Sequence, residues 1–196
     1  MKQKTDFLLA GVGGQGTLLA SNILAEVGLR AGYDVKKSEV HGMAQRGGSV
    51  TSHVRWADKV YAPIIGQGEV DYLLAFERLE ALRYVEQLRP GGTLVVSEHG
   101  IPPISVTAGK DQYPADEHIR RVFGEVAGKV IWVPSIKLAE ELGNARVHNV
   151  IMLGALSAQL DVDERVWLEV IEQRVPARFV ELNQKAFRRG RDNSSY

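Results

Sequence analysis

Three glycines near the amino end of the chain have a spacing that can bind an anion. Gly11, Gly13 and Gly16 form the pattern G-x-G-x-x-G, between a short apolar run and a stretch with helical periodicity. Glycine tolerates positive φ and lets another group approach its backbone closely. The first N–H groups of the following helix lie unpaired at the positive end of the helix dipole, where they attract an anion or a carbonyl oxygen. Residues 5–30 are therefore expected to form a strand, a glycine turn and a helix around one candidate site.

The glycine pattern alone leaves three interpretations open. It occurs in dinucleotide-binding turns, in other phosphate-binding turns, and where a helix simply packs tightly on a strand. A Walker-type phosphate loop is excluded, because Thr17 follows Gly16 directly with no lysine between them. A ligand or substrate site and a structural or subunit contact both remain open at this point.

A second segment, residues 38–49, is polar, rich in glycine and without clear helical or strand periodicity. It ends with the residues Gln45, Arg46, Gly47, Gly48 and Ser49. Together they can offer a guanidinium, flexible backbone amides and a hydroxyl to one anion, and a guanidinium suits carboxylate or phosphate through two parallel hydrogen bonds. The alternative is a turn or β-bulge in which Arg46 pairs with Glu39 or Glu77.

Three further side chains are candidates for acid, base or polar contacts. Glu39 follows the second expected strand, where a dinucleotide-binding fold places its ribose-binding acid, so a nicotinamide or flavin site stays open. His41 titrates near neutral pH and can act as an acid or a base, although a loop histidine more often makes a packing or hydrogen-bonding contact. Glu77 follows an apolar strand and is either a site carboxylate or the acid in the first turn of a helix.

The composition excludes several classes of protein. Lysine plus arginine and aspartate plus glutamate both number 24 in 196 residues, so no net charge draws the chain to nucleic acid or to a membrane surface. No apolar run approaches the roughly 20 residues of a membrane span. The amino terminus lacks a signal-peptide pattern, so a cytoplasmic location is expected. The chain has no cysteine, which rules out iron–sulfur clusters ligated by its own cysteines, and no pair of its 5 histidines has metal-site spacing, so no metal is expected.

Strand-like and helix-like segments alternate along most of the chain. Strands are expected around residues 8–10, 34–38, 50–56, 71–76, 93–97 and 130–133. The alternation predicts an α/β fold with an open, mostly parallel sheet, helices on both faces, and a helical part at about residues 149–190, in one domain spanning residues 1–196. Ligands of such sheets bind outside the carboxyl ends of the strands, so the glycine turn, residues 38–49 and Glu77 are expected along one edge.

The residues alone show no nucleophile elbow, paired-carboxylate motif or metal motif. The two unusual segments in combination resemble a known family. GVGGQG at residues 11–16 and SEVHGMAQRGGSVTSHVR at residues 38–55 resemble the gamma domain of 2-oxoacid:ferredoxin oxidoreductases and, within that family, the beta subunits of the indolepyruvate ferredoxin oxidoreductases. Residues 62–83, 147–156 and 180–190 fit the same pattern, so the resemblance covers nearly the whole chain.

The resemblance implies a Rossmann-like fold and a shared reaction. Enzymes of this family decarboxylate a 2-oxoacid on thiamine diphosphate, form an acyl-CoA and pass electrons through iron–sulfur clusters to ferredoxin, and the indolepyruvate type prefers arylpyruvates. The resemblance implies that a larger partner subunit carries thiamine diphosphate, Mg²⁺ and the clusters, that CoA is a co-substrate, and that this chain is inactive alone. The absence of cysteine agrees with that division of labour.

The family's two motifs map onto residues that we expect to face the partner subunit and the approach of CoA or substrate. They are Gly11, Gly13, Gly14, Gln15, Gly16, Ser38, Glu39, Gln45, Arg46, Gly47, Gly48 and Ser49, and the candidates His41 and Glu77 join them. None is expected to be catalytic by itself: the chain would shape and close the site, exclude water and offer positive groups to an anion, with Arg46 as the anion contact. An NAD(P)- or flavin-binding oxidoreductase and a purely structural scaffold subunit are the alternatives.

Overall fold

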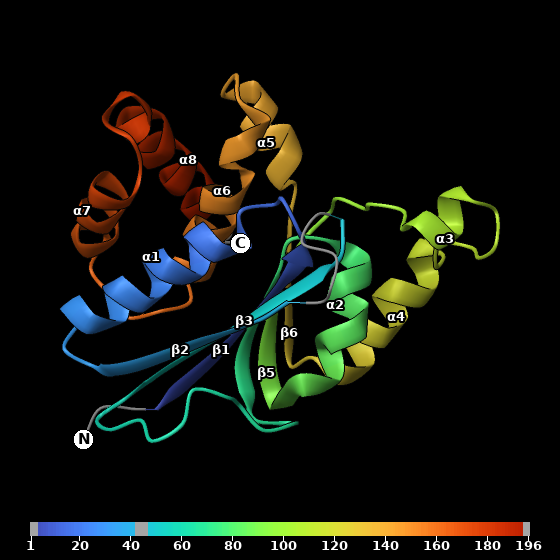
Figure 1. The fold of residues 1–196 in the computed structure, drawn as a ribbon, viewed down its shortest axis with the longest axis horizontal. Coiled ribbons are helices and arrows are strands. Elements are labelled where there is room, and N and C mark those ends of the chain that lie inside the picture. Colours follow the sequence, from blue (N-terminus) through green and yellow to red (C-terminus); the bar gives the residue numbers. More distant parts are fainter. Residues whose placement is uncertain (1–3, 42–46, 194–196) are drawn as a thin grey trace.

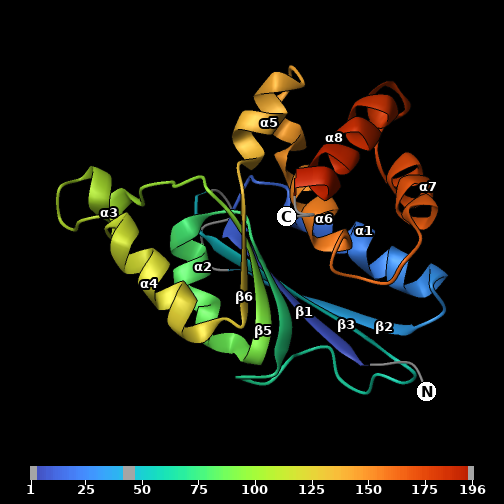
Figure 2. The ribbon, with the colours of Figure 1, turned by 180° about the vertical axis from the view of Figure 1, so that it is seen from behind.

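The structure is a computed structural model that describes residues 4–41 and 47–193. These residues form one six-stranded sheet in the order β2-β3-β1-β4-β5-β6, with helices on both faces (Figures 1 and 2). The strands are β1 (Thr5–Val12), β2 (Asp34–His41), β3 (Ser49–Ala57), β4 (Val70–Ala75), β5 (Leu88–Ser97) and β6 (Lys129–Val133). The helices are α1 (Thr17–Arg30), α2 (Arg78–Tyr84), α3 (Ile104–Thr107), α4 (Asp116–Val126), α5 (Ser135–Glu141), α6 (His148–Ser157), α7 (Glu164–Arg174) and α8 (Val180–Asn193).

The sheet is mostly parallel, as the sequence predicts, and β3 is the strand that runs the other way. β1, β4, β5 and β6 pair in parallel, whereas β3 pairs antiparallel with both β1 and β2. β1 and β2 therefore point the same way, and α1 connects them across β3. Because β3 is reversed, it begins at the edge of the sheet where the parallel strands end.

The strand predicted at residues 34–38 is too short. β2 continues to His41, and Ser38 and Glu39 lie within it, paired with His53 and Ser52 of β3. The sequence gives little strand signal here because β2 is an edge strand of the sheet, and an edge strand tolerates charged and polar side chains.

Alternate residues of β1 belong to two separate hydrophobic cores. Phe7 and Leu9 pack in the core that includes residues of α1, α6, α7 and α8, whereas Leu8 and Ala10 pack in the core that includes residues of α2 and α4. All four side chains are buried. The apolar run without alternation in the sequence is thus the signature of a strand covered on both faces.

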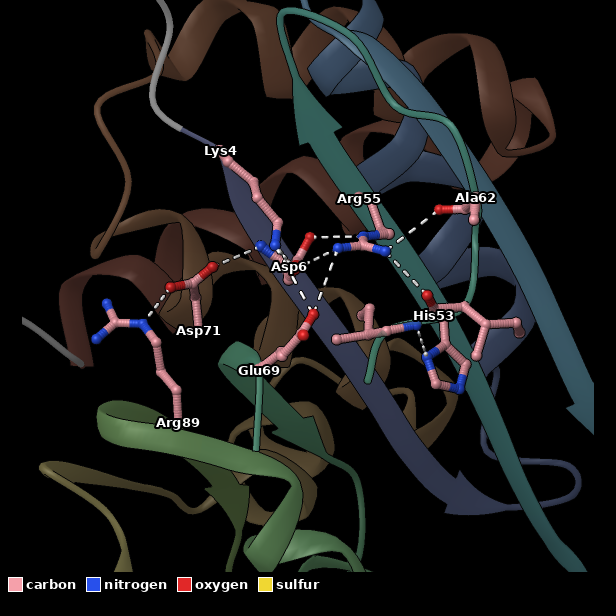
Figure 3. A network of polar contacts seen from close by, with 10 residues as sticks. Lys4, Asp6, His53, Arg55, Ala62, Glu69, Asp71 and Arg89 are labelled. Carbon is pink, nitrogen blue, oxygen red and sulfur yellow. Dashed lines mark hydrogen bonds and ion pairs between the residues drawn. The ribbon is translucent and has the colours of Figure 1, made fainter. Parts of the chain in front are cut away.

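A network of charged side chains fixes the amino ends of the parallel strands (Figure 3). Asp6 is fully buried, and its two carboxylate oxygens accept hydrogen bonds from the Arg55 Nε and Nη2 atoms, both at 2.9 Å. Lys4 Nζ lies 2.9 Å from the same carboxylate. The backbone N–H of Asp6 donates to Asp71 at 2.7 Å, and Arg89 donates to the other oxygen of Asp71 at 2.5 Å. This network joins β1, β3, β4 and β5 at the end opposite to the glycine turn.

The same arginine holds the long connection between β3 and β4. Arg55 donates to the carbonyl of Ile64 at 2.9 Å, and the backbone N–H of Ile65 donates to His53 Nδ1 at 3.3 Å. Residues 58–69 contain no helix or strand, so these contacts from β3 supply much of their order.

Helices α6 and α8 cross at two glycines. All ten residues of α6 are buried. A Cβ atom added at Gly154 would lie 2.0 Å from the carbonyl oxygen of Phe187, and one added at Gly190 would lie 1.9 Å from the carbonyl oxygen of Ile151. The two backbones approach so closely that no larger residue fits without moving a helix. None of the helices in the described residues is long and apolar enough to cross a bilayer.

Replacing Gly190 with alanine should therefore destabilise the fold strongly. The added methyl group forces α8 away from α6, and we expect the free energy of unfolding to fall by about 3 kcal/mol, at the upper end of overpacking costs. Gly124 in α4 is the matched control, because a Cβ atom there meets no atom within 4 Å. Gly124→Ala should stabilise the protein by roughly 0.5–1 kcal/mol through helix propensity. Equal effects of the two substitutions in urea denaturation would contradict the close crossing.

Candidate functional site

The glycine turn, residues 11–16, lies against the described end of the second unusual segment, residues 47–49, at the edge of the sheet where the parallel strands end. The backbone N–H of Gly13 donates to the carbonyl of Gly48 at 2.8 Å, and the N–H of Gly47 donates to the carbonyl of Gly13 at 3.3 Å. The next residue, Ser49, is paired with Val12 at the end of β1. The glycine turn and the residues that lead into β3 are therefore one structural unit, as expected from the predicted fold.

Gln15 holds the glycine turn from inside. Its side chain is buried, its Oε1 atom accepts a hydrogen bond from the N–H of Val12 at 2.8 Å, and its Nε2 atom donates to the carbonyl of Phe76 at 2.9 Å. A Cβ atom added at Gly11 would lie 3.1 Å from Gln15 Oε1 and 3.2 Å from Phe76 Cβ. Gly11 thus makes room for the glutamine, and the glutamine ties the turn to the end of β4.

Gly16 and Gly14 differ in their surroundings. Gly16 adopts φ 79° as the residue before α1, and a Cβ atom there would lie 2.3 Å from the Nδ2 atom of Asn149, which donates to the Gly16 carbonyl at 3.3 Å. Gly14 also has positive φ, but a Cβ atom there would meet no atom within 4 Å. Gly16 is therefore needed for packing on α6, whereas Gly14 borders open space.

A cavity of about 490 Å³ lies between the glycine turn and β3. It is lined by Gly13, Gly14, Gly16, Thr17, Leu18, Val50 and Ser52. The residue at the N-cap of α1 is Gly16, which has no side chain to cap the helix, and the first residues of α1, Thr17 and Leu18, line the cavity with it. Among the described residues that line the cavity none carries an ionisable side chain, and the start of α1 is the feature among them that attracts an anion.

Ser38 and Glu39 lie in β2, next to the strand that lines the cavity. Glu39 is directly opposite Ser52, and opposite residues of an antiparallel pair share a face, so Glu39 is on the cavity face of the sheet. Its carboxylate pairs with Lys37, which also donates to Asn22 of α1 at 2.5 Å. The acid is thus engaged with a lysine on its own strand.

Ser49 and Glu77 are connected to the other face of the sheet, that of α2. The Ser49 hydroxyl donates to the carboxylate of Glu80. Glu77 is buried and caps α2, since its Oε2 atom accepts from the N–H of Glu80 at 2.8 Å. Its Oε1 atom accepts from the N–H of Ile101 at 2.8 Å and from the hydroxyl of Tyr113. Glu77 therefore fastens both ends of the connection between β5 and α4, which agrees with the interpretation of Glu77 as a helix-start acid.

Three predicted site residues are described in part or not at all. Gln45 and Arg46 lie outside the described residues. For His41 the structure describes the backbone, which pairs with Val50 at the end of β2.

His148, which no motif of the sequence marks as a site residue, lies behind the glycine turn. Its ring is buried and packs edge to face on Phe76, with 6.1 Å between the ring centroids. Burial, together with the nearby His99, lowers the pKa of His148 to about 4, and a hydrogen bond with the backbone of Gln15 opposes this shift. No residue that the structure describes makes a hydrogen bond to its Nδ1 atom. With this lowered pKa the ring is neutral at physiological pH, and it packs behind the turn as an uncharged side chain.

The described residues contain no group of three or more histidine, cysteine, aspartate or glutamate side chains placed to hold a metal ion. The chain also has no cysteine, so its residues do not fit an iron–sulfur cluster. The dinucleotide interpretation also fits poorly, because the turn uses the N–H groups of Val12 and Gly13 internally and Glu39 pairs with Lys37.

Fold and site together define an α/β domain with a glycine-lined cavity at the edge of the sheet where the parallel strands end. The chain belongs to the pyruvate ferredoxin/flavodoxin oxidoreductase family, whose profile matches residues 6–193. This confirms the resemblance seen in the sequence.

Individual relatives agree with the family. Indolepyruvate oxidoreductase subunit IorB of Pyrococcus horikoshii is 42% identical over 185 residues, which cover 93% of this chain and 92% of that protein. 2-Oxoglutarate synthase subunit KorC of Methanothermobacter marburgensis is 29% identical over 200 residues, which cover 96% of each. The solved gamma subunit of a keto/oxoacid ferredoxin oxidoreductase from Geobacter sulfurreducens superposes with a TM-score of 0.72 at 27% identity, covering 97% of this chain and 98% of that one.

The buried neutral His148 should make stability depend on pH. Its pKa is 6.5 in an unfolded chain and about 4 in the fold, so as pH falls below 6.5 the unfolded chain takes up a proton that the folded chain refuses. Between about pH 7 and about pH 5 this difference removes about 2 kcal/mol of stability. His148→Gln should lose about that much less over the same interval in urea denaturation. His118→Gln, at an exposed histidine of α4, is the control and should behave like the unmodified protein. Identical pH dependence of the two variants would contradict the assignment.

Proposed function

We propose that this chain is the small subunit of a 2-oxoacid:ferredoxin oxidoreductase that acts on an arylpyruvate such as indolepyruvate. The holoenzyme decarboxylates the 2-oxoacid oxidatively, forms an acyl-CoA and transfers electrons to ferredoxin. The family assignment and the 42% identity to an indolepyruvate oxidoreductase subunit, against 29% to a 2-oxoglutarate synthase subunit, support this choice. Residues 1–196 act as one domain, because the carboxyl-terminal helices pack into the same core as β1.

The observation that carries the proposal is the joining of the two motif segments beside a cavity. Gly13 and Gly48 are hydrogen-bonded at 2.8 Å, and the uncapped start of α1 forms the adjacent wall. This edge faces the partner subunit and the approach of CoA or substrate. Gly13, Gly14 and Gly16 allow close approach to the backbone, and Arg46 supplies the positive charge, whereas Gln15, Ser49 and Glu77 hold the surrounding backbone.

The cofactors belong to the larger partner subunit. Thiamine diphosphate, Mg²⁺ and the iron–sulfur clusters are bound there, CoA is the co-substrate, and ferredoxin meets the assembled enzyme. The absence of cysteine in this chain supports that division, since the clusters are held by cysteine thiolates. This chain closes the reaction site, excludes water and orients the anionic reactant.

The decisive experiment assembles the chain, under anaerobic conditions, with a larger cysteine-rich, thiamine-binding subunit from the same genome. The pair should reduce ferredoxin with CoA and indolepyruvate, more efficiently than with pyruvate or 2-oxoglutarate, and neither subunit should turn over alone. Turnover by the isolated chain, or nicotinamide binding to it in calorimetric titration, would support the dehydrogenase alternative instead.

Arg46→Ala in the assembled enzyme tests the anion contact. Loss of one charge-assisted contact should raise KM for CoA or for the 2-oxoacid roughly tenfold, which corresponds to about 1.4 kcal/mol, with the chain still folded. Arg121→Ala, at an exposed arginine of α4, serves as the control and should leave kinetics unchanged. If Arg46→Ala weakens assembly but leaves the kinetics of the assembled enzyme intact, the scaffold alternative is favoured.

A further inference from the structure

The first turn of α2 carries a second buried carboxylate, Glu80, which is 4% exposed. Its Oε2 atom accepts a hydrogen bond from the Ser49 hydroxyl at 2.5 Å, and the Tyr84 hydroxyl lies 3.1 Å from the same Ser49 oxygen. The only ion pair recorded for Glu80 in the part of the chain that the structure describes is with Arg83, at 3.5 Å, and the arginine side chain is half exposed. Glu80 is thus directed at the start of β3.

Ser49 connects the Glu80 carboxylate to the glycine turn. Ser49 directly follows Gly48, whose carbonyl accepts the hydrogen bond from the Gly13 N–H at 2.8 Å. A continuous path of short contacts therefore runs from the Glu80 carboxylate through Ser49 and Gly48 to the glycine turn. The Gly13 end of that path lines the cavity.

The helix that carries Glu80 is itself firmly placed. Glu77 caps α2 by accepting from the backbone N–H of Glu80 at 2.8 Å, and Ala81, the next residue, is fully buried in the core beneath the helix. A side chain on such a turn has little freedom, so it can transmit the position of α2 to the residues it binds.

The buried carboxylate of Glu80 depends on its hydrogen-bond partner at the start of β3. Burial raises the pKa of Glu80, and the hydrogen bond from Ser49 and the charge of Arg83 oppose this only in part, while the charge of Glu77 adds to it. Burying this side chain carries a desolvation cost that the hydrogen bond from Ser49 offsets in part, so the Glu80–Ser49 contact is favoured at this position.

We propose that Glu80 is a positioning residue for the reaction: through Ser49 it fixes Gly47 and Gly48 against the glycine turn and so sets the shape of the cavity wall. This inference rests on the function proposed for the carboxyl edge. Glu80 does not touch the reactants, and it acts only through the backbone that borders them.

The test compares four single variants and one double variant of the chain, each assembled with the larger subunit. Glu80→Ala and Ser49→Ala each delete the contact, Glu80→Gln keeps an acceptor for the hydroxyl, and Glu86→Ala, at an exposed acid in the turn that follows α2, is the control. Glu80→Ala and Ser49→Ala should raise KM for CoA or indolepyruvate roughly fivefold with kcat changed less than about twofold, and Glu80→Gln and Glu86→Ala should stay within about twofold of the unmodified enzyme. The double variant should be no worse than either deletion alone, because both remove one interaction.

Hydrogen exchange of the full chain gives a readout that does not depend on turnover. The Gly47 N–H, which donates to the Gly13 carbonyl, should exchange roughly tenfold faster in Glu80→Ala and in Ser49→Ala, and at the unmodified rate in Glu86→Ala. Ser49→Ala keeps the test valid if Glu80→Ala does not fold. Unchanged exchange in both deletions overturns the role of Glu80 and leaves the proposed function standing. Faster exchange with unchanged KM and kcat overturns the role of Glu80 in the reaction and removes the carboxyl edge from the reaction site, whereas loss of ferredoxin reduction by the unmodified assembled enzyme would overturn the proposed function itself.

Discussion

The backbone of Gly13 is hydrogen-bonded through both its N–H and its carbonyl to the residues that lead into β3, and the whole carboxyl edge depends on this pair of bonds. They form because β3 is antiparallel to β1, so its first residue, Ser49, sits at the end of β1 rather than at its start. A fully parallel sheet would begin this strand at the opposite edge. The reversed strand brings a glycine-rich segment against the glycine turn, and the turn is closed by the protein's own backbone.

A layer of buried polar side chains supports that turn from behind. Gln15 satisfies backbone groups at the ends of β1 and β4, and Asn149 donates to Gly16 across 133 positions of sequence. Both side chains are buried, so each lost hydrogen bond would leave an unsatisfied group away from water. The helix that supplies Asn149 is in turn fixed by its glycine crossing with α8, which couples the carboxyl-terminal helices to the turn.

On the proposed assignment this chain contributes a surface and the partner subunit contributes the reactive groups. A wall of glycines and a helix start suits that task, since it offers backbone dipoles to an anion without side chains that would compete for protons or electrons. The acidic residues Glu77 and Glu80 lie away from the cavity lining. Glu77 connects α2 to the segment that follows β5, and Glu80 connects α2 to the start of β3. The charged network around Asp6 and Arg55 fixes the opposite end of the same strands, so both ends of the sheet are held.

The sequence by itself determined the alternation of strands and helices, the burial of β1 on both faces and the family. The first two follow from the local spacing of apolar residues, and the family follows from two short motifs that can be read directly from the sequence. It also placed the two motif segments on one edge, since the carboxyl ends of parallel strands meet there. The extension of β2 to His41, the reversal of β3, and the contacts of Gln15, Glu80 and His148 were decided only by the tertiary structure. Each of these depends on which residues distant in sequence become neighbours, and a polar side chain carries no local signal of whether it will meet solvent, a ligand or a buried backbone group.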